Sequence, residues 1–286
     1  MLAALFVALQ YVLPQHLLTA LVWRIARIRN AAIKDFLITR FVGLYKVDID
    51  DVELAVPSGF ATFNDFFVRA LKADARPVDL ANDSIVSPVD GTISVAGTIR
   101  HDSIIQAKGI DYTLLDLLAT DTEQANAYVD GSFATIYLAP YNYHRVHAPL
   151  DGELIAAHYI PGDLFSVNDA TVARVPGLFR RNERLVMHWQ TASGPFCLVF
   201  VGALNVGSIS TPWSGERRPQ KRGVVDVLDL SRQTTAIRKG DLLGWFNMGS
   251  TVILLSPAGV YEWDDKLQVG ATVRVGEAIG RKKQRP

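Results

Sequence analysis

Residues 246–255 contain a short segment that could carry out chemistry on its own backbone. Gly249, Ser250 and Thr251 stand between a turn-prone stretch and a run of aliphatic residues. Glycine permits strained or left-handed backbone conformations, and a strained carbonyl beside a hydroxyl favours an N→O acyl shift. The Ser250 oxygen would attack the Gly249 carbonyl to form an ester. β-Elimination would then free the upstream chain and leave dehydroalanine, which hydrolyses to a pyruvoyl group. The alternative is an ordinary turn before a strand, since turns favour these residue types.

Such a reaction needs a base for the serine and a group that orients the base. His147 could accept the Ser250 proton near neutral pH, and a buried carboxylate could hold the imidazole in the required tautomer. Asp90 and Asp151 are candidates for that carboxylate, because each lies in a Pro-x-Asp-Gly turn and Asp151 is four residues from His147. The residues alone leave both open.

A second histidine, His144, lies three residues before His147. On a helix the two would share a face, whereas on a strand they would point to opposite sides. Each could also be a satisfied structural residue. A zinc site built from both and either His158 or His188 is a further alternative. Two histidines three apart with no glutamate between them are a weak zinc signal, so we predict no metal.

Four segments of the chain follow one another in an order and spacing that match a known family. They resemble the processing, aspartate, histidine and Phe-Phe-Val-Arg motifs of prokaryotic-type phosphatidylserine decarboxylases, and the resemblance covers roughly residues 60 to 280. The processing segment has Met248 where the family usually has leucine, a swap of similar volume that should be tolerated. In the order just given, the segments are residues 239–252, 87–91, 141–149, and 66–72 followed by Arg76-Pro77.

The resemblance implies that Asp90, His147 and Ser250 form the self-cleaving set, with Asp90 preferred over Asp151. Cleavage between Gly249 and Ser250 would give a β chain, 1–249, and an α chain, 250–286. The two chains would stay together as a heterodimer, with further oligomerisation left open. The cofactor would be a covalent pyruvoyl group derived from Ser250.

The resemblance also implies the substrate and the second reaction. The amine of phosphatidylserine would condense with the pyruvoyl carbonyl, which accepts the electrons released as CO2 leaves. The product would be phosphatidylethanolamine. His144 is the candidate for contact with the substrate carboxylate or for the protonation that follows. The acyl chains of this substrate would explain an apolar N-terminus, because the enzyme must meet its substrate at a bilayer.

A non-enzymatic alternative is a membrane-tethered carrier or scaffold of the lipoyl- or biotinyl-carrier type. The Pro-x-Asp-Gly turns at residues 88–91 and 149–152 and the apolar N-terminus favour it. A carrier of that kind is expected to show a Met-Lys pair at a hairpin tip, and the sequence contains none.

The charge of the chain is zero overall but unevenly distributed. Residues 1–46 carry six Lys or Arg and one Asp, a net of +5, and residues 281–286 carry four basic residues. Basic ends on an acidic body predict attraction to an anionic membrane surface, and the alternative for the tail is a solvated basic face. Nucleic acid is disfavoured as a partner, because the N-terminal basic residues are interleaved with leucine and isoleucine. The single cysteine, Cys197, lies in an apolar run and is predicted to be buried.

Residues 1–23 are strongly apolar but are interrupted by Gln10, Pro14, Gln15 and His16. A membrane-spanning helix needs about 20 mostly apolar residues, and a signal peptide has its basic residues before the apolar run, so neither fits. From Leu17 the pattern becomes that of an amphipathic helix lying in a membrane interface. We therefore predict a peripheral protein on the cytoplasmic side of the cell membrane; the alternative is a helix packed on the protein's own core. The apolar side comprises Leu17, Leu18, Leu21, Val22, Ile25 and Ile28, flanked by Arg24, Arg27 and Arg29.

The predicted fold is α+β, with helices in a membrane-associating region, 1–60, and a mostly antiparallel β catalytic domain, 61–286. With 286 residues, 49% of them hydrophobic, the chain can build a large core. Breaks near Pro14 and Asn30 predict two or three N-terminal helices, and Thr62 predicts the start of another that runs to Leu71. Short β-like runs bounded by Gly, Pro, Asp and Asn begin near Ile85. The strands are expected at 91–99, 133–138, 153–160, 184–189, 196–201 and 251–255, a short helix at 112–119, and a long exposed loop at 211–223.

Overall fold

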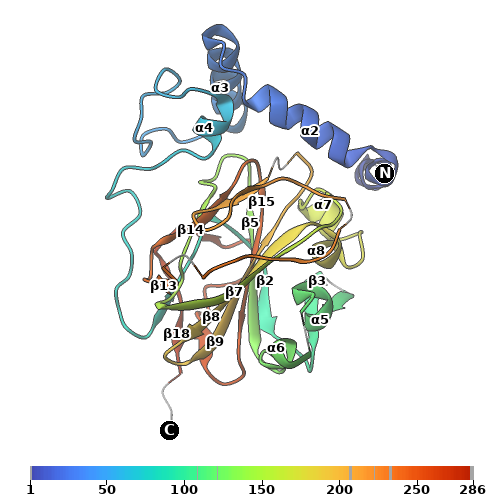
Figure 1. Ribbon diagram of the computed structural model, residues 1–286, viewed down its shortest axis with the longest axis vertical. Coiled ribbons are helices and arrows are strands. Elements are labelled where there is room, and N and C mark those ends of the chain that lie inside the picture. Colours follow the sequence, from blue (N-terminus) through green and yellow to red (C-terminus); the bar gives the residue numbers. More distant parts are fainter. Residues whose placement is uncertain are drawn as a thin grey trace.

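The computed structural model describes residues 2–107, 109–120, 122–205, 208–221, 223–231 and 234–283. Three helices lie together at one end of the molecule, above a body made of strands (Figure 1). They are α1 (Leu2–Val12), α2 (Gln15–Ala26) and α3 (Ala31–Tyr45). The predicted breaks at Pro14 and Asn30 are confirmed, and the Asn30 side chain caps α3 by accepting a hydrogen bond from the Ile33 amide at 3.2 Å.

None of the described helices could cross a membrane alone. The helices over Ala3–Val12 and Gln15–Ala26 could do so only as a pair, judged by length and composition, and they are bent by 93° relative to each other.

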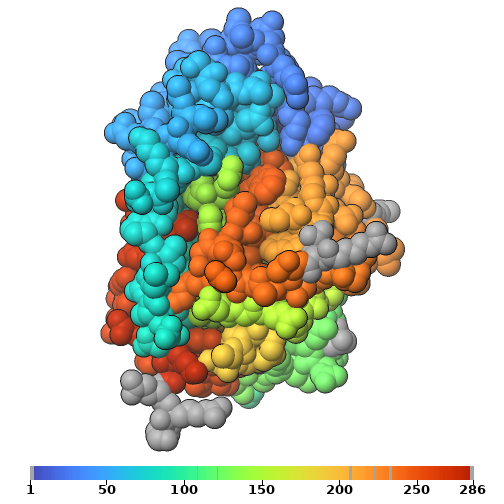
Figure 2. Space-filling view, turned by 60° about the vertical axis from the view of Figure 1, so that its left-hand side comes forward, coloured from blue at the N-terminus to red at the C-terminus, as the bar shows by residue number. Residues whose placement is uncertain are grey.

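The helical end includes a fourth helix, α4 (Phe63–Phe67), capped by Thr62 as predicted but shorter than expected. Aromatic residues of α4 pack with α3 in one hydrophobic cluster, where Phe41 and Phe67 have ring centroids 5.8 Å apart. The helical unit therefore continues beyond residue 60. The segment between α4 and β1 (Ser84–Val86) then runs down the side of the body (Figure 1; Figure 2).

The body is built on an antiparallel sheet in which the strands follow the order β12-β7-β8-β9-β15-β5-β2-β17, with β13 also paired to β7. The predicted strands are all present, and Cys197 is buried on β9 as expected. The bounds are β2 (Gly91–Thr98), β5 (Ser132–Leu138), β7 (Gly152–Ile160), β8 (Arg184–Thr191), β9 (Gly194–Val201), β12 (Asp226–Val227), β13 (Ala236–Ile237), β15 (Ser250–Ser256) and β17 (Thr272–Val273).

A second sheet, ordered β11-β10-β14-β6, covers one face of the large one. The Phe200 and Phe246 rings pack between them with centroids 5.2 Å apart. Its strands are β6 (Arg145–His147), β10 (Ile209–Thr211), β11 (Gly215–Arg217) and β14 (Leu242–Phe246). The exposed loop predicted at 211–223 is therefore wrong in part, since β10 and β11 form a hairpin there. Arg222, at the end of that loop, lies outside the described residues.

Smaller elements complete the body. The helix predicted at 112–119 is shorter, because Tyr112 and Thr113 belong to a strand and Thr113 caps the helix that follows. These elements are β3 (Ser103–Ala107), β4 (Ile110–Thr113), α5 (Leu114–Leu118), α6 (Thr122–Asn126), α7 (Asp169–Val172), α8 (Leu178–Arg181), β16 (Tyr261–Trp263) and β18 (Ala278–Lys282).

The two Pro-x-Asp-Gly turns face each other with a local twofold relation. The Val86 amide donates to the Pro149 carbonyl at 3.1 Å, and the His147 amide donates to the Pro88 carbonyl at 2.8 Å. Each donor lies two residues before the proline of its own turn, so the contacts are reciprocal. The sequence echo is thus a structural one.

The repeat extends to a second pair of segments, Arg238–Gly244 and Arg274–Gly280, which share the pattern Arg-x-Gly-acid-x-aliphatic-Gly. The Gly276 amide donates to the Ser87 carbonyl at 3.0 Å, and the Gly240 amide donates to the Ala148 carbonyl at 2.9 Å. The second repeat is hard to recognise in the sequence. The first turn, at residues 88–91, pairs with the later segment, Arg274–Gly280, and the second turn pairs with the earlier segment, Arg238–Gly244.

Candidate active site

The Gly-Ser-Thr segment is a sharp turn between β14 and the central strand β15. Gly249 has a φ of +31°, in the region that favours glycine. Ser250 is the first residue of β15, pairs with Leu138 on β5 and is only 1% exposed. Its hydroxyl has no hydrogen-bond partner among the described residues. A buried, uncommitted serine hydroxyl therefore follows directly on a glycine with a left-handed backbone.

Residues just before the turn fix it to both the body and the helices. The Asn247 side-chain amide donates to the hydroxyls of Ser208 and Ser210, each at 2.8 Å, and accepts from Asn64 at 3.0 Å. Met248 packs against the hydrophobic cluster of α3 and α4. The position therefore favours an apolar side chain, and the flexible methionine can fill it in place of leucine.

His147 on β6 is oriented by groups other than a carboxylate. Its Nδ1 lies 2.8 Å from the Gly240 carbonyl, which fixes that nitrogen as the donor, and its Nε2 lies 3.0 Å from the Tyr143 hydroxyl. Burial, followed by the charge of Arg145, lowers the pKa of His147. The expected hydrogen bond between a carboxylate and this histidine is therefore absent from the described contacts, because the Gly240 carbonyl occupies the position that a carboxylate would take.

The two candidate carboxylates occupy equivalent places in the twofold arrangement. Asp90 accepts from the Val275 amide at 2.9 Å, and Asp151 accepts from the Lys239 amide at 2.7 Å. Asp90 is buried and forms an ion pair with Arg76 at 2.6 Å, whereas Asp151 is exposed. The charge of Asp90 partly opposes the lowering of the His147 pKa. The buried member of the pair is thus the one whose field reaches the histidine.

His144 is completely buried and directly precedes β6. Its ring stacks on Phe67 of α4, with centroids 4.1 Å apart, and its Nε2 lies 3.4 Å from the Pro140 carbonyl. Burial, with the nearby charge of Arg69, lowers the pKa of His144 to about 3. The imidazole is therefore neutral at physiological pH, which disfavours it as a proton donor.

The strands β14, β15, β5 and β2 come together at the end of the large sheet where Ser250 lies. The His144 carbonyl accepts from the Phe246 amide at 3.1 Å, which ties the histidine segment to the strand before the turn. Ser250 pairs with Leu138, and the neighbouring strand β2 begins beside Asp90. Of the predicted residues, His144 is the one that contacts α4, and His147 pairs with Leu242 at the other end of β14. No described hydrogen bond joins either histidine to the Ser250 hydroxyl.

Arg69 lies in the Phe-Phe-Val-Arg motif but was given no role by the sequence analysis. It is buried, and its Nη2 donates to the Tyr141 and Asn142 carbonyls at 3.1 and 3.2 Å. Its Nε has no hydrogen-bond partner among the described residues. Burial lowers its pKa to about 10, so it stays charged. Arg69 lines a cavity of about 300 Å3 together with Asp90 and Tyr143, where an anionic group would find a positive charge.

The other histidines lie elsewhere. His158 and His188 are neighbours on β7 and β8, with ring centroids 5.8 Å apart, and the Tyr128 hydroxyl lies 3.3 Å from His188. Among the residues that the structure describes, no three His, Cys, Asp or Glu side chains are grouped so that they could hold a metal ion.

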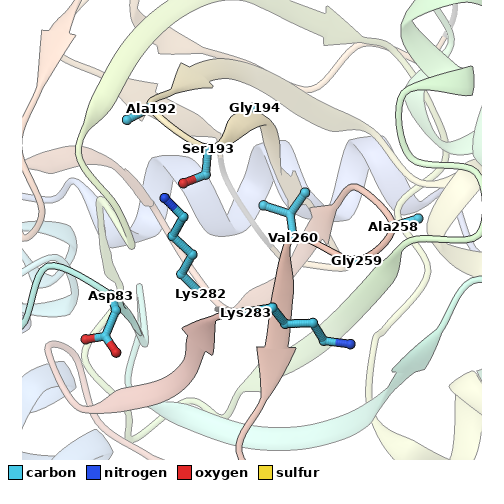
Figure 3. Close-up of a pocket in the computed structure, with 9 residues that line it drawn as sticks. All are labelled: Asp83, Ala192, Ser193, Gly194, Ala258, Gly259, Val260, Lys282 and Lys283. Carbon is cyan, nitrogen blue, oxygen red and sulfur yellow. The ribbon is translucent and has the colours of Figure 1, made fainter. Parts of the chain in front are cut away.

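A separate cavity of about 840 Å3 lies at the opposite end of the large sheet, near the C-terminus. In Figure 3 the Ser193 hydroxyl and the Lys282 ammonium point toward each other across it, while Lys283 points away. Because Ser250 lies at the other end of β15, this cavity is not part of the candidate active site.

Comparison with known proteins identifies the family. A family model described as phosphatidylserine decarboxylase matches residues 63–281, and a second, described as PSD, matches residues 5–46. The phosphatidylserine decarboxylase proenzyme of Alcanivorax borkumensis is 45% identical over 277 residues, which cover 96% of this chain and 95% of that protein. The protein of the same name from Saccharophagus degradans is 45% identical over 275 residues, 96% of each chain.

The chain belongs to the phosphatidylserine decarboxylase family.

Family membership makes the chain an enzyme of the phosphatidylserine decarboxylase type and removes support from the non-enzymatic carrier. The two matched ranges follow the architecture, since residues 5–46 span α1 to α3 and residues 63–281 span α4 and the β body. The relatives are named as proenzymes, and all four motifs noted in the sequence lie within the larger match.

Proposed function

We propose that this phosphatidylserine decarboxylase cleaves itself between Gly249 and Ser250 and acts through a pyruvoyl group derived from Ser250. It would convert phosphatidylserine to phosphatidylethanolamine and CO2. The observation that carries the proposal is the buried Ser250 hydroxyl, which has no hydrogen-bond partner in the described part of the chain and directly follows a glycine with a φ of +31°. A free hydroxyl keeps its lone pairs available for attack, and the left-handed glycine bends the chain sharply at the peptide bond under attack.

The residues around position 250 fit a carbonyl cofactor. Such a group supplies an electron-accepting carbonyl to a bound amine. Ser250 and both neighbouring strands are buried, which would keep water from the carbonyl. Because β15 pairs along its length with β5 and β9, the 250–286 chain would stay bound to the 1–249 chain as a heterodimer after cleavage.

His147 is the proposed base for self-cleavage. Its Nδ1–H is committed to the Gly240 carbonyl, so its Nε2 lone pair is the one that can accept a proton. Asp90, neutralised in part by Arg76, contributes the negative field that steadies the protonated ring. His144 and Arg69 are the proposed contacts for the anionic groups of the substrate, the first through a neutral imidazole and the second through its charge.

The N-terminal helices support attachment to a membrane, because they bury polar residues against the body and expose apolar residues to the outside. Gln10 and Gln15 are buried and hold the helices to the body, through bonds from the Ser166 amide at 2.8 Å and the Leu164 amide at 2.9 Å. On α2, Leu17, Leu21 and Ile25 are 65%, 51% and 41% exposed. Apolar residues directed away from the protein fit a peripheral position on the cytoplasmic face of the cell membrane.

One basic residue of this surface has a different partner from the one expected. Arg27 donates to Glu216 on β11 at 2.7 Å and stacks over Trp23 at 4.2 Å. Its charge is therefore largely satisfied within the protein. Arg24 and Arg29 are exposed and remain the candidates for attraction to anionic lipid.

The proposal is tested with the purified chain and vesicles that contain phosphatidylserine. Intact mass should give two pieces divided at Gly249, the smaller one blocked at its N-terminus because a pyruvoyl group has no amine. Phosphatidylethanolamine and CO2 should appear in equal amounts. A chain that stays whole yet decarboxylates the lipid would refute the cleavage step, and a cleaved chain with no product would refute the substrate.

The lowered pKa of His147 sets the pH dependence of self-cleavage. A base works in its neutral form, and a pKa below the ordinary 6.5 keeps it neutral in mildly acidic solution. We expect freshly translated chain to keep its cleavage rate to a lower pH than a histidine with the ordinary pKa would allow, and to lose rate as the solution becomes more acidic. Arg145→Gln removes a positive charge that lowers this pKa and should move the acidic limb to higher pH. A limb that does not move would exclude His147 as the titrating base.

Membrane binding is expected to depend on the exposed side of α2. A triple variant in which Leu17, Leu21 and Ile25 are replaced by Ser should be released from anionic vesicles. Each aliphatic side chain that is buried in the membrane contributes about 1.5–3 kcal/mol to binding. The salt-sensitive electrostatic contribution to vesicle binding should remain, at about 1 kcal/mol for each basic residue near the membrane surface. Sedimentation with vesicles measures both.

The matched control replaces exposed aliphatic residues of the body, Leu80, Val224 and Val269, by Ser. This control should bind vesicles normally, and both triple variants should still cleave themselves. Equal binding by the α2 variant and the control would instead locate the membrane contact elsewhere on the protein.

A further inference from the structure

A buried acid, Glu183, lies at the same end of the large sheet as Ser250. It directly precedes β8 and has 0% exposure. Its Oε2 accepts a hydrogen bond from the Tyr159 hydroxyl at 2.6 Å, while its Oε1 has no partner among the described residues. Burial raises the pKa of Glu183 to about 8. The carboxyl is therefore predominantly neutral at pH 7, and none of the roles assigned so far uses it.

The strand register places Glu183 next to Ser250. Val201 on β9 pairs with Arg184 on one side and with Thr251 on the other. One residue further along, Gly202 lies between Glu183 and Ser250, and the Gly202 amide donates to the Glu183 carbonyl at 2.9 Å. Residues directly opposite one another in antiparallel strands project from the same face. Glu183 and Ser250 therefore share a face, with only a glycine between them.

Gly202 lets the acid lean toward β15. A Cβ at Gly202 would lie 2.6 Å from both the Cγ and the Oε1 of Glu183, so any other residue would push the carboxyl away. The Glu183 carboxyl therefore lies over Gly202, the residue that separates it from Ser250 in the sheet. Glu183 Oε1 and Ser250 Oγ, which both lack a hydrogen-bond partner among the described residues, thus lie on the same face of the sheet on either side of a glycine.

We propose that Glu183 is the proton donor at position 250 for the decarboxylation step. This inference rests on the proposed function. When CO2 leaves, the electron pair of the broken C–C bond must end in a new C–H bond, so each turnover consumes one proton. Glu183 would deliver that proton from Oε1 and become a carboxylate, which water then reprotonates.

The surroundings of Glu183 suit this role. Neither histidine is a ready donor, since the pKa of His144 is about 3 and that of His147 is lowered. The Tyr159 hydroxyl that contacts Glu183 also accepts from the Gln220 amide at 3.3 Å. Gln220 lines a cavity of about 470 Å3 beside α2, so Tyr159 connects the acid with a place that water can occupy.

The decisive variant is Glu183→Gln, which keeps the shape and can still accept the Tyr159 hydrogen bond but holds no acidic proton. It should fold and cleave itself, and its turnover on phosphatidylserine vesicles should fall by about 100-fold or more, the usual contribution of a positioned acid. Thr135→Val is the matched control, since it removes another buried hydrogen-bonding group from the same sheet. The control should retain normal turnover.

Two readouts do not depend on activity. Infrared spectra of wild type should contain the band of a protonated carboxyl at pH 7 that is absent from Glu183→Gln and disappears with a midpoint near pH 8. Tyr159→Phe removes a hydrogen bond that favours the ionised form, so the midpoint should move to higher pH.

The second readout is thermal stability. Between the ordinary pKa of 4.5 and the raised pKa of about 8, folded wild type keeps a proton that the unfolded chain has lost. Wild-type stability therefore decreases as pH rises through this window. Glu183→Gln lacks this loss, so its Tm relative to wild type should increase from pH 5 to pH 8.

Three results would overturn the inference. They are turnover in Glu183→Gln comparable to wild type, a carboxyl already ionised at pH 7, and loss of self-cleavage in Glu183→Gln, which would assign the acid to the earlier step. In each case wild type would still convert phosphatidylserine, so the proposed function would stand. A wild-type protein that makes no phosphatidylethanolamine would refute both.

Discussion

Ser250→Ala is expected to remain a single chain of 31.5 kDa and to show no decarboxylase activity. The substitution removes the only oxygen that can attack the Gly249 carbonyl from the next residue, and with it the precursor of the cofactor. The fold should survive, because the hydroxyl has no described hydrogen-bond partner to lose and the residue sits in a fully paired strand. Denaturing gels, intact mass and product formation on phosphatidylserine vesicles measure the result.

The matched control is Thr251→Ala, one residue further along β15. Thr251 is equally buried, its hydroxyl also lacks a described partner, and its side chain projects from the other face of the sheet. This variant should cleave and turn over substrate. Two pieces from Ser250→Ala, or an active uncleaved chain, would end the proposal that Ser250 is the nucleophile and cofactor precursor.

The second large effect separates cleavage from turnover. His147→Ala should slow self-cleavage by about 10²–10⁴-fold, because it removes the proposed base. His144→Ala should cleave to a measurable extent and then decarboxylate poorly, since the neutral imidazole is assigned to substrate contact. Time courses of cleavage after translation, followed by turnover of the cleaved fraction, give the two rates. A His144 variant that fails only in cleavage would show that the two roles are reversed.

The equivalent turns provide an internal test of the rival carboxylates. Asp90→Asn and Asp151→Asn make the same chemical change at positions related by the local twofold axis, each accepting one backbone amide. Asp90→Asn should slow cleavage strongly, because it removes the charge that favours a protonated His147. Asp151→Asn should cleave normally. Slower cleavage in the Asp151 variant alone would assign the role to the exposed carboxylate instead.

The sequence by itself predicted the N-terminal helix breaks and the main strands, and it led to the hypothesis of backbone cleavage at Ser250. Breaks at Pro14 and Asn30, the Thr62 cap and the alternation of the strands depend on neighbouring residues, so local patterns were sufficient to predict them. The residue types at Gly249 and Ser250 likewise pointed to backbone cleavage. The order of the four motifs indicated the phosphatidylserine decarboxylase family, and the comparisons with known proteins confirm that membership.

Only the tertiary structure decided which groups surround those residues. Arg76 as the partner of Asp90, Gly240 as the acceptor for His147, and Glu183 across Gly202 from Ser250 all depend on strands that are far apart in sequence. No local pattern reports such pairings, because register is fixed by the whole sheet. The orientation of α2 was also decided by the tertiary structure. The spacing of its apolar residues predicted an apolar side, but the hydrogen bonds of Gln10 and Gln15 to the body determine that this side faces outward.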